Sequence, residues 1–220
     1  MNAAPLDSDP AIHSPAESVD RVLAEAGAPH RPIDRPLDQS VEASADVPEP
    51  RGIAVSGAQI AALLSERGWL GDATTPEIED WLVEAAALLG PQAEDLAALE
   101  DLLTLIFHYD AQELLARPAS HAVIVRESAR EVLRALGTMI LAGPALDSGR
   151  YKEIVAALRA STGSQGQKLF YPVRLALAGR IGGGALDRVI LLLDRAATLP
   201  FRSQVKSNRQ RILEFCAAMD

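Results

Sequence analysis

The residues of this chain that could do chemistry are few, and their spacing matches no common catalytic or metal site. None of the four histidines, His13, His30, His108 and His121, has another ligand residue at metal-binding spacing. Cys216 has no neighbouring histidine, and no serine lies in a strand-turn-helix nucleophile elbow. We therefore predict no catalytic residue, no metal and no cofactor.

A run of three glycines, Gly182, Gly183 and Gly184, is the nearest approach to a phosphate-binding loop. The run follows a predicted helix where a phosphate loop would follow a strand. It also lacks the lysine and the serine or threonine that hold phosphate and magnesium. The simpler interpretation is a turn between two helices that approach each other closely.

The basic side chains are concentrated towards the C-terminus, although the chain as a whole carries a net charge of −9. Residues 1–52 hold four basic and ten acidic side chains, and residues 53–147 hold five and fifteen. Residues 148–220 hold twelve and five, which gives +7. A positive C-terminal third is the distribution expected if only that part faces a polyanion such as RNA. The alternative is that these cations only solvate helix faces.

The elements that must position these residues are all helical. After Gly52, apolar residues recur at three- and four-residue spacing between Gly and Pro breaks, and no long period-two run appears. We expect an all-α bundle with helices at about 56–68, 75–90, 92–107, 120–141, 147–160, 172–179, 185–197 and 201–218. Two buried stripes are predicted: Ile78, Trp81, Leu82, Ala85 and Leu89 in one helix, and Val125, Ala129, Val132, Leu133, Leu136 and Ile140 in another. We divide the helical part into subdomains 53–147 and 148–220.

Residues 1–52 differ in composition from the rest. They are rich in Pro, Ala, Asp, Glu and Ser, with apolar residues too scattered to form a packing face. We interpret them as a disordered acidic tail, in which a helix at 18–25 would be marginal. No stretch has the roughly 18 to 20 apolar residues that a bilayer requires, and the start lacks the features of a signal peptide. We expect no membrane contact and a cytoplasmic location.

Residues 165–193, QGQKLFYPVRLALAGRIGGGALDRVILLL, form the most specific segment. Pro172 is predicted to open a helix, which would hold Arg174 near a helix N-terminus while Val173, Ala176 and Leu177 are buried. An arginine so placed can pair with phosphate, or hydrogen-bond to and stack on an unstacked base, as in the recognition of single-stranded RNA loops. The alternative for Arg174 is a structural ion pair.

This segment resembles the C-terminal helical region of bacterial glutamyl-tRNA synthetases. The family pattern is Gly-Lys, then Leu-Phe-x-Pro-x-Arg-x-Ala-Leu-Thr-Gly, a short loop, Pro-x-Leu and an apolar helix. The matching residues are Gly166, Lys168, Leu169, Phe170, Pro172, Arg174, Ala176, Leu177, Gly179, Leu186 and residues 189–193. Weaker matches at Phe107, Tyr109 and Asp110 and over residues 202–215 extend the resemblance to about residues 75–220.

The resemblance implies a helical anticodon-binding-domain-like bundle and a site for tRNA. In the family the arginine matching Arg174 lies at the anticodon, and the leucine matching Leu186 packs near it. The candidate tRNA-binding residues are Lys168, Arg174, Arg180, Gly183, Leu186, Arg188, Lys206 and Arg209. We expect Arg174 to contact a base and Lys206 and Arg209 to contact the RNA backbone.

The chain also departs from the family pattern. The family's Lys-Gly-Lys is Gln165, Gly166 and Gln167 here, its threonine is Ala178, and its loop proline is absent. Losing these groups would cost affinity for RNA. The nucleotide-binding signatures His-x-Gly-His and Lys-Met-Ser-Lys-Ser are also missing from the 220 residues. The resemblance to the non-catalytic half of the synthetase therefore implies that these residues neither bind ATP nor activate glutamate, so that the chain is not an enzyme.

Three functions remain open from the sequence. The first is a module that binds tRNA, with tRNA-Glu as the first candidate, without aminoacylating it, or that assists a synthetase. The second is a protein-interaction module, in which the acidic residues 53–147 repel RNA and the scaffold binds a protein. The third is the C-terminal part of a split or decayed glutamate-tRNA ligase.

Overall fold

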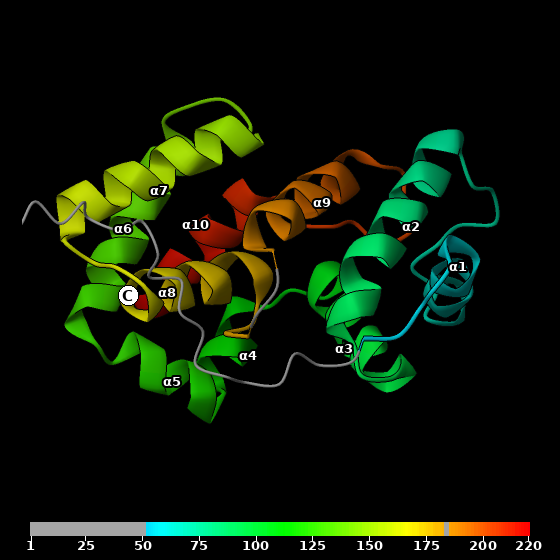
Figure 1. Ribbon diagram of the computed structural model, residues 1–220, viewed down its shortest axis with the longest axis horizontal. Helices are drawn as coiled ribbons and strands as arrows, with labels where there is room; N and C mark the ends of the chain where they lie inside the picture. The colour runs from blue at the N-terminus through cyan, green and yellow to red at the C-terminus, as the bar shows by residue number, and fades with distance from the viewer. Residues whose placement is uncertain (1–51, 183–184) are drawn as a thin grey trace, which may run out of the picture. The chain divides into compact units, whose positions relative to one another are not determined.

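The computed structural model describes residues 52–220 except 183–184 (Figure 1). The predicted acidic tail, with its short helix at 18–25, therefore lies outside the described residues apart from Gly52. The described part is all-α, as predicted, and contains no strand. Its helices are α1 (Gly57–Glu66), α2 (Pro76–Leu89), the 3-10 helix η1 (Gly90–Gln92), α3 (Leu96–Phe107), α4 (Ala111–Ala116), α5 (Pro118–Ile124), α6 (Glu127–Leu141), α7 (Ser148–Thr162), α8 (Gln167–Ala178), α9 (Leu186–Thr198) and α10 (Asn208–Met219).

Capping side chains set three of the helix starts that the sequence predicted. Ser56 caps α1 in a capping box with Gln59, Thr75 caps α2 ahead of Pro76, and Asp147 caps α7. Gly179 ends α8 with φ 73°, a left-handed conformation that a residue with a Cβ adopts only at a cost. These boundaries are confirmed.

Pro172 does not open a helix, contrary to the prediction. It lies inside α8, which begins five residues earlier at Gln167, while Gly166 accepts the first backbone hydrogen bonds from Leu169 and Phe170. A proline at this depth removes one hydrogen bond, to the carbonyl of Lys168. The helix tolerates the loss because its apolar face is fully buried on both sides of the proline. Arg174 is consequently in the middle of α8 and not in its first turn.

The helix predicted over 120–141 is two helices. Arg126 adopts an extended backbone, with ψ 125°, between α5 and α6, although no Gly or Pro marks the break. Val125, predicted to be buried, is 65% exposed, whereas the other five residues of that stripe are buried as predicted. The short helix α4 was also missed: Asp110 caps it by accepting hydrogen bonds from the backbone of Gln112 and Glu113.

The segment before α10 is irregular where a helix was predicted from Phe201. The Phe201 ring packs edge-on to Trp81 and Phe107, with centroid distances of 5.1 Å to each. Arg202 donates its backbone N–H to the carbonyl of Trp69. The helix starts only after Ser207, which forms a capping box with Gln210. The packing of the Phe201 ring against Trp81 and Phe107 therefore outweighs the preference for a helix at this position.

The buried apolar side chains form two clusters, and each draws on both sides of residue 147. The first cluster joins α1, α2 and α3 to the C-terminal half of α9 and to Phe201 and Val205. The second joins α4–α8 to the start of α9 and to α10. Figure 1 shows α1–α3 at one side and α5–α7 at the other, with α8, α9 and α10 between them. The division into 53–147 and 148–220 stays a prediction.

The stripe predicted on α2 is confirmed, and it is the core of the first cluster. Ile78, Trp81, Leu82, Ala85 and Leu89 are all buried. The indole Nε1 of Trp81 also donates to the carbonyl of Leu192, 3.0 Å away in α9. None of the described helices is long and apolar enough to cross a membrane.

Candidate nucleic-acid interface

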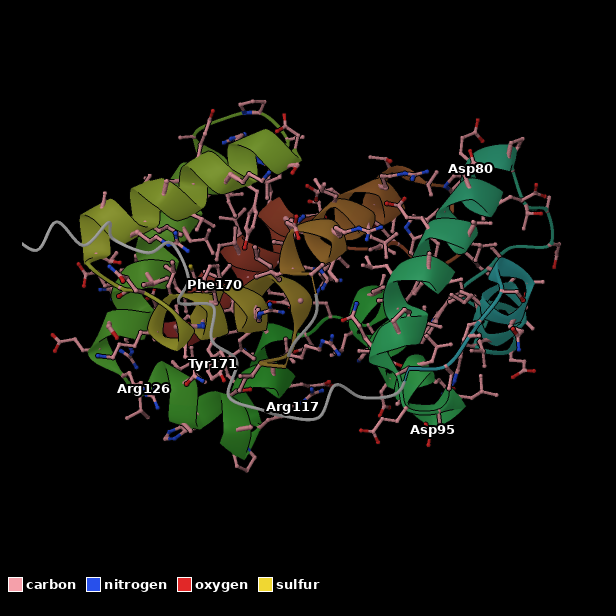
Figure 2. All side chains as sticks on the ribbon, in the orientation of Figure 1. Asp80, Asp95, Arg117, Arg126, Phe170 and Tyr171 are labelled. Atoms are coloured by element: carbon pink, nitrogen blue, oxygen red, sulfur yellow. The ribbon has the colours of Figure 1, made fainter. Side chains whose placement is uncertain are left out.

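One face of α8 combines aromatic and arginine side chains. Phe170 and Arg174 are spaced at i and i+4, and Tyr171 and Arg174 at i and i+3, so Arg174 neighbours both rings, and all three residues are half-buried. The guanidinium of Arg159, on α7, lies over the Phe170 ring at 5.6 Å from its centroid. Figure 2 shows Phe170 and Tyr171 on α8. Flat aromatic and guanidinium groups are the ones on which unpaired bases stack.

The guanidinium of Arg174 lies at the edge of this face, next to the turn after α8. Its Nη1 donates a hydrogen bond to the carbonyl oxygen of Gly182, at 3.0 Å. Burial lowers the pKa of Arg174, and the nearby Tyr151, Tyr171 and Asp187 act in the opposite direction. The side chain remains a cation at neutral pH and is hydrogen-bonded to the segment that follows α8.

Arg180 is close to Arg174 and gives the same region a second cation. Burial, and then the charge of Arg174, lower the pKa of Arg180. Its Nη2 donates to the side-chain oxygen of Gln92, the last residue of η1, which belongs to the other side of the bundle. Two half-buried arginines therefore lie in the region between the end of α8 and the start of α9.

Tyr151 contributes a buried polar atom beside this pair. Its side chain is 7% exposed, and within the described residues its hydroxyl has no hydrogen-bond partner. Burial raises the pKa of this phenol to about 12. Arg174 and Asp187 are among the charged groups that act on it. A buried hydroxyl without a partner costs free energy unless a ligand or water completes it.

The remaining predicted residues of this region differ in exposure. Leu186, the first residue of α9, is buried in the second cluster, whereas Arg188 is exposed two residues along. Lys168 is exposed in the first turn of α8, on a different side of the helix from Arg174. Gly183 lies outside the described residues. The structure thus brings together Arg174, Arg180 and the start of α9.

The charged groups of Lys206 and Arg209 form hydrogen bonds with other residues of the chain. The Lys206 ammonium lies 2.8 Å from the backbone carbonyl of Tyr109 and pairs with the carboxylate of Glu214. The Arg209 guanidinium donates to the carbonyl oxygens of Leu141 and Gly143, at 2.7 and 2.8 Å, where it caps the end of α6. Their contact with RNA stays a prediction, and both have a structural task.

Arg211 was not singled out from the sequence as a site residue, yet it is fully buried, with 0% exposure. Its guanidinium donates to the carbonyl oxygens of Ile106, Leu177 and Lys206, at 2.7 to 3.0 Å. It also lies 4.5 Å from the centroid of the Tyr109 ring. Burial lowers its pKa to about 10. No sequence signal distinguishes it from the exposed Arg209 two residues earlier.

Arg211 fixes the C-terminal end of α8 to the C-terminal end of α3. The Tyr109 hydroxyl supports the same end of α8 by donating to the carbonyl of Ala176, at 2.6 Å. A buried cation at two helix C-termini is favoured by the partial negative charge of their carbonyl groups. The network therefore positions the helix that carries Arg174. Across residues 52–182 and 185–220, no group of three or more His, Cys, Asp and Glu residues could hold a metal ion.

Residues 59–200 match a protein-family model described as an anticodon binding domain. The chain belongs to the anticodon-binding domain family. It is 28% identical to the glutamate-tRNA ligase of Bacillus thuringiensis (strain Al Hakam) over 138 residues, or 62% of this chain and 27% of that ligase. It is 32% identical to glutamate-tRNA ligase 2 of Syntrophus aciditrophicus (strain SB) over 114 residues, or 51% of this chain and 23% of the ligase. The chain therefore spans about a quarter of the length of these curated relatives.

These similarities confirm the resemblance inferred from residues 165–193. The anticodon-binding domain match runs from α1 to the end of α9. It includes Lys168, Arg174, Arg180, Leu186 and Arg188 and ends before Lys206 and Arg209. The residues that the structure brings together thus all lie inside the part that defines the family.

Proposed function

We propose that this anticodon-binding domain binds the anticodon loop of a tRNA on the face formed by α7, α8 and the start of α9. Arg174 would contact a base, with Arg180 and Arg188 on phosphates and Leu186 beneath the loop. Lys168, on another side of α8, belongs to the proposed site from the sequence. Gly183, Lys206 and Arg209 belong to the proposed site from the sequence, the last two as contacts to the RNA backbone. The proposed tRNA is tRNA-Glu, because the relatives are named glutamate-tRNA ligases.

The observation that carries the proposal is the side chain of Arg174. It is held on one side by the Gly182 carbonyl and lies near Tyr171 of α8 and the Tyr151 hydroxyl, which has no hydrogen-bond partner among the described residues. A guanidinium with a fixed orientation can form paired hydrogen bonds to a base edge or phosphate at a low entropy cost. Unstacked bases are read by such groups together with aromatic rings.

We also propose that these 220 residues do not aminoacylate tRNA. They contain neither nucleotide-binding signature of the synthetase family. The purified chain is expected to give no ATP-pyrophosphate exchange with any amino acid. Glutamate-dependent exchange would contradict this part of the proposal and leave tRNA binding to be judged separately.

The test of tRNA binding is a fluorescence titration with tRNA-Glu and with an unrelated tRNA over a range of salt concentrations. The logarithm of the affinity should fall with the logarithm of the salt concentration by roughly 0.7 to 0.9 per phosphate neutralised. Arg174→Ala should weaken binding of tRNA-Glu by about 1 to 3 kcal/mol and narrow the preference between the two tRNAs. Arg188→Ala, at an exposed position, should weaken both tRNAs alike, because backbone contacts carry no sequence information.

The alternatives predict a different outcome. If the scaffold serves only to bind a protein, neither tRNA binds at micromolar concentration in physiological salt, and Arg174→Ala lowers thermal stability alone. If the chain is the C-terminal part of a split glutamate-tRNA ligase, a separate catalytic part should restore aminoacylation, and Arg174→Ala should reduce that restored rate.

A further inference from the structure

A groove of about 330 Å³ lies between α1 and α2, away from the proposed RNA-binding face. Its lining is mostly apolar and small. The residues that form it include Ala58 and Ala61 from α1, Leu82 and Val83 from α2, and the polar Thr74 and Glu79. Val83 is 64% exposed, so a large apolar side chain in this groove is left to water.

The shape of the groove follows from three small residues on α1. A Cβ at Gly57 would lie 3.2 Å from the backbone nitrogen of Val83, so the two helices approach closely at that point. Further along α1, the methyl side chains of Ala58 and Ala61 leave the space open. The groove has few convergent polar groups, which argues against a small polar ligand, since such ligands need them for orientation. An apolar groove between two helices suits an amphipathic helix from a partner.

The segment that forms the groove is strongly acidic. Residues 53–110 contain eleven acidic side chains and one basic residue, Arg67, which pairs with Glu100, while Glu84, next to Val83, pairs with Arg195 of α9. Asp80 and Asp95, labelled in Figure 2, lie on α2 and before α3. Such a surface repels the phosphates of RNA and attracts lysine and arginine. The occupant with a complementary charge is therefore a basic protein segment.

We propose that the groove between α1 and α2 binds a basic amphipathic helix of a partner protein. The apolar side chains of that helix, spaced by three and four residues, would cover Ala58, Ala61, Leu82 and Val83. Its lysines or arginines would face Glu79 and neighbouring acidic residues. This inference does not depend on tRNA binding, because it uses other helices and the opposite charge.

The probe is a fluorescent, designed 18-residue helix with leucine at positions i, i+3, i+4 and i+7 and lysine at most others. A second peptide has glutamate in place of lysine. The full chain should bind the lysine peptide, and the glutamate peptide at least about tenfold more weakly. No binding of the lysine peptide at 100 μM protein, on the order of the weakest useful affinity, would overturn the proposal.

The decisive variant is Val83→Glu, which places a carboxylate in the groove while making the surface more negative. If the peptide occupies the groove, its affinity should fall at least about tenfold, which corresponds to about 1.4 kcal/mol. If charge attraction alone holds the peptide, affinity should rise slightly or stay the same, and that result overturns the proposal. The matched control is Leu96→Glu, at a 52% exposed residue of α3 outside the groove lining, which should not weaken binding.

Thermal unfolding, sedimentation and tRNA titration complete the test. Both exposed substitutions should leave the thermal midpoint unchanged, which excludes loss of the fold. In sedimentation, the unmodified chain should not form a dimer through the groove. A concentration-dependent dimer that Val83→Glu removes would mean that a second copy of the chain occupies the groove, and that result would overturn the proposal. Val83→Glu should leave tRNA affinity unchanged, so failure of the groove and failure of the proposed RNA site are distinguishable.

Discussion

The two sides of the helical bundle are made of similar helices but carry opposite charges. Residues 53–110, which supply most of the first cluster, hold one basic and eleven acidic side chains. Residues 111–220, which supply the whole of the second cluster except Tyr109, hold sixteen basic and nine acidic side chains. The charge changes sign at about residue 110, where the chain passes from α3 to α4.

The change in the sign of the charge coincides with the boundary between the two buried clusters, and not with the division of the chain at residue 147. Dividing the chain at residue 147 placed Arg117, Arg126, Arg130 and Arg134 in an acidic segment, although they lie on or beside α5 and α6. The acidic side chains are concentrated on the side that carries the α1–α2 groove. A protein partner and an RNA would therefore be attracted to different regions of one molecule.

The largest expected effect comes from the residue that joins the two sides. Arg211→Ala should lower the free energy of unfolding by about 3 to 5 kcal/mol, because it leaves buried carbonyl groups of α3 and α8 without their donor. Arg209→Ala, two residues away and exposed, should cost about 1 kcal/mol. Urea unfolding monitored by circular dichroism measures both. Equal effects would show that Arg211 does not hold the two sides together.

Two tyrosine substitutions compare a buried hydroxyl that has a hydrogen-bond partner with one that has none among the described residues. Tyr109→Phe removes the donor to Ala176 and should cost about 1 to 3 kcal/mol. Tyr151→Phe removes a buried hydroxyl that has no partner in the described residues, and should be neutral or stabilising by up to about 1 kcal/mol. For RNA binding the expected direction is the opposite. If the Tyr151 hydroxyl forms a hydrogen bond with a base of the bound tRNA, Tyr151→Phe should weaken tRNA binding. A large loss of stability in Tyr151→Phe would mean that the hydroxyl has a partner.

The same tyrosine predicts a pH effect. Burial raises the pKa of Tyr151 to about 12, so between pH 10 and 12 the folded protein keeps a proton that the unfolded chain releases. The resulting stabilisation is complete below the unfolded pKa of about 10 and is lost as the pH rises through the folded value. At pH 11 the loss should be about 1 kcal/mol greater in the unmodified chain than in Tyr151→Phe. Comparing the two proteins cancels the contributions of other groups, including Arg211.

The smallest expected effect concerns long-range repulsion. Neutralising two exposed acids with Asp80→Asn and Asp101→Asn should raise tRNA affinity by less than about threefold at low salt. The gain should vanish near 0.15 M salt, where the Debye length is about 8 Å, since these residues lie on α2 and α3 away from the proposed site. A titration at two salt concentrations measures this. A gain that persists at high salt would place RNA directly on the acidic side.

The helical class, most helix starts and the buried stripe of α2 could be predicted because they depend on local chemistry. Ser56, Thr75 and Asp147 satisfy free backbone N–H groups within the next few residues, and Gly179 accepts a left-handed backbone. The spacing of apolar residues likewise determines which side of α2 is buried. Arg174 could be singled out from the sequence because it belongs to a distinctive motif, and its contact with RNA stays a prediction.

Long-range packing decided the rest. Pro172 is tolerated inside α8 because the surrounding core outweighs one lost hydrogen bond, and Phe201 leaves the helix to fill an aromatic cluster. Arg211 and Arg209 have the same side chain two residues apart, yet one is buried among carbonyl groups and the other is exposed. Local sequence fixes how each helix begins, ends and faces the core. Which distant carbonyl groups and rings meet a given side chain is set only when the helices pack, because those contacts join residues far apart in the sequence, such as Arg211 and Ile106, which are 105 positions apart.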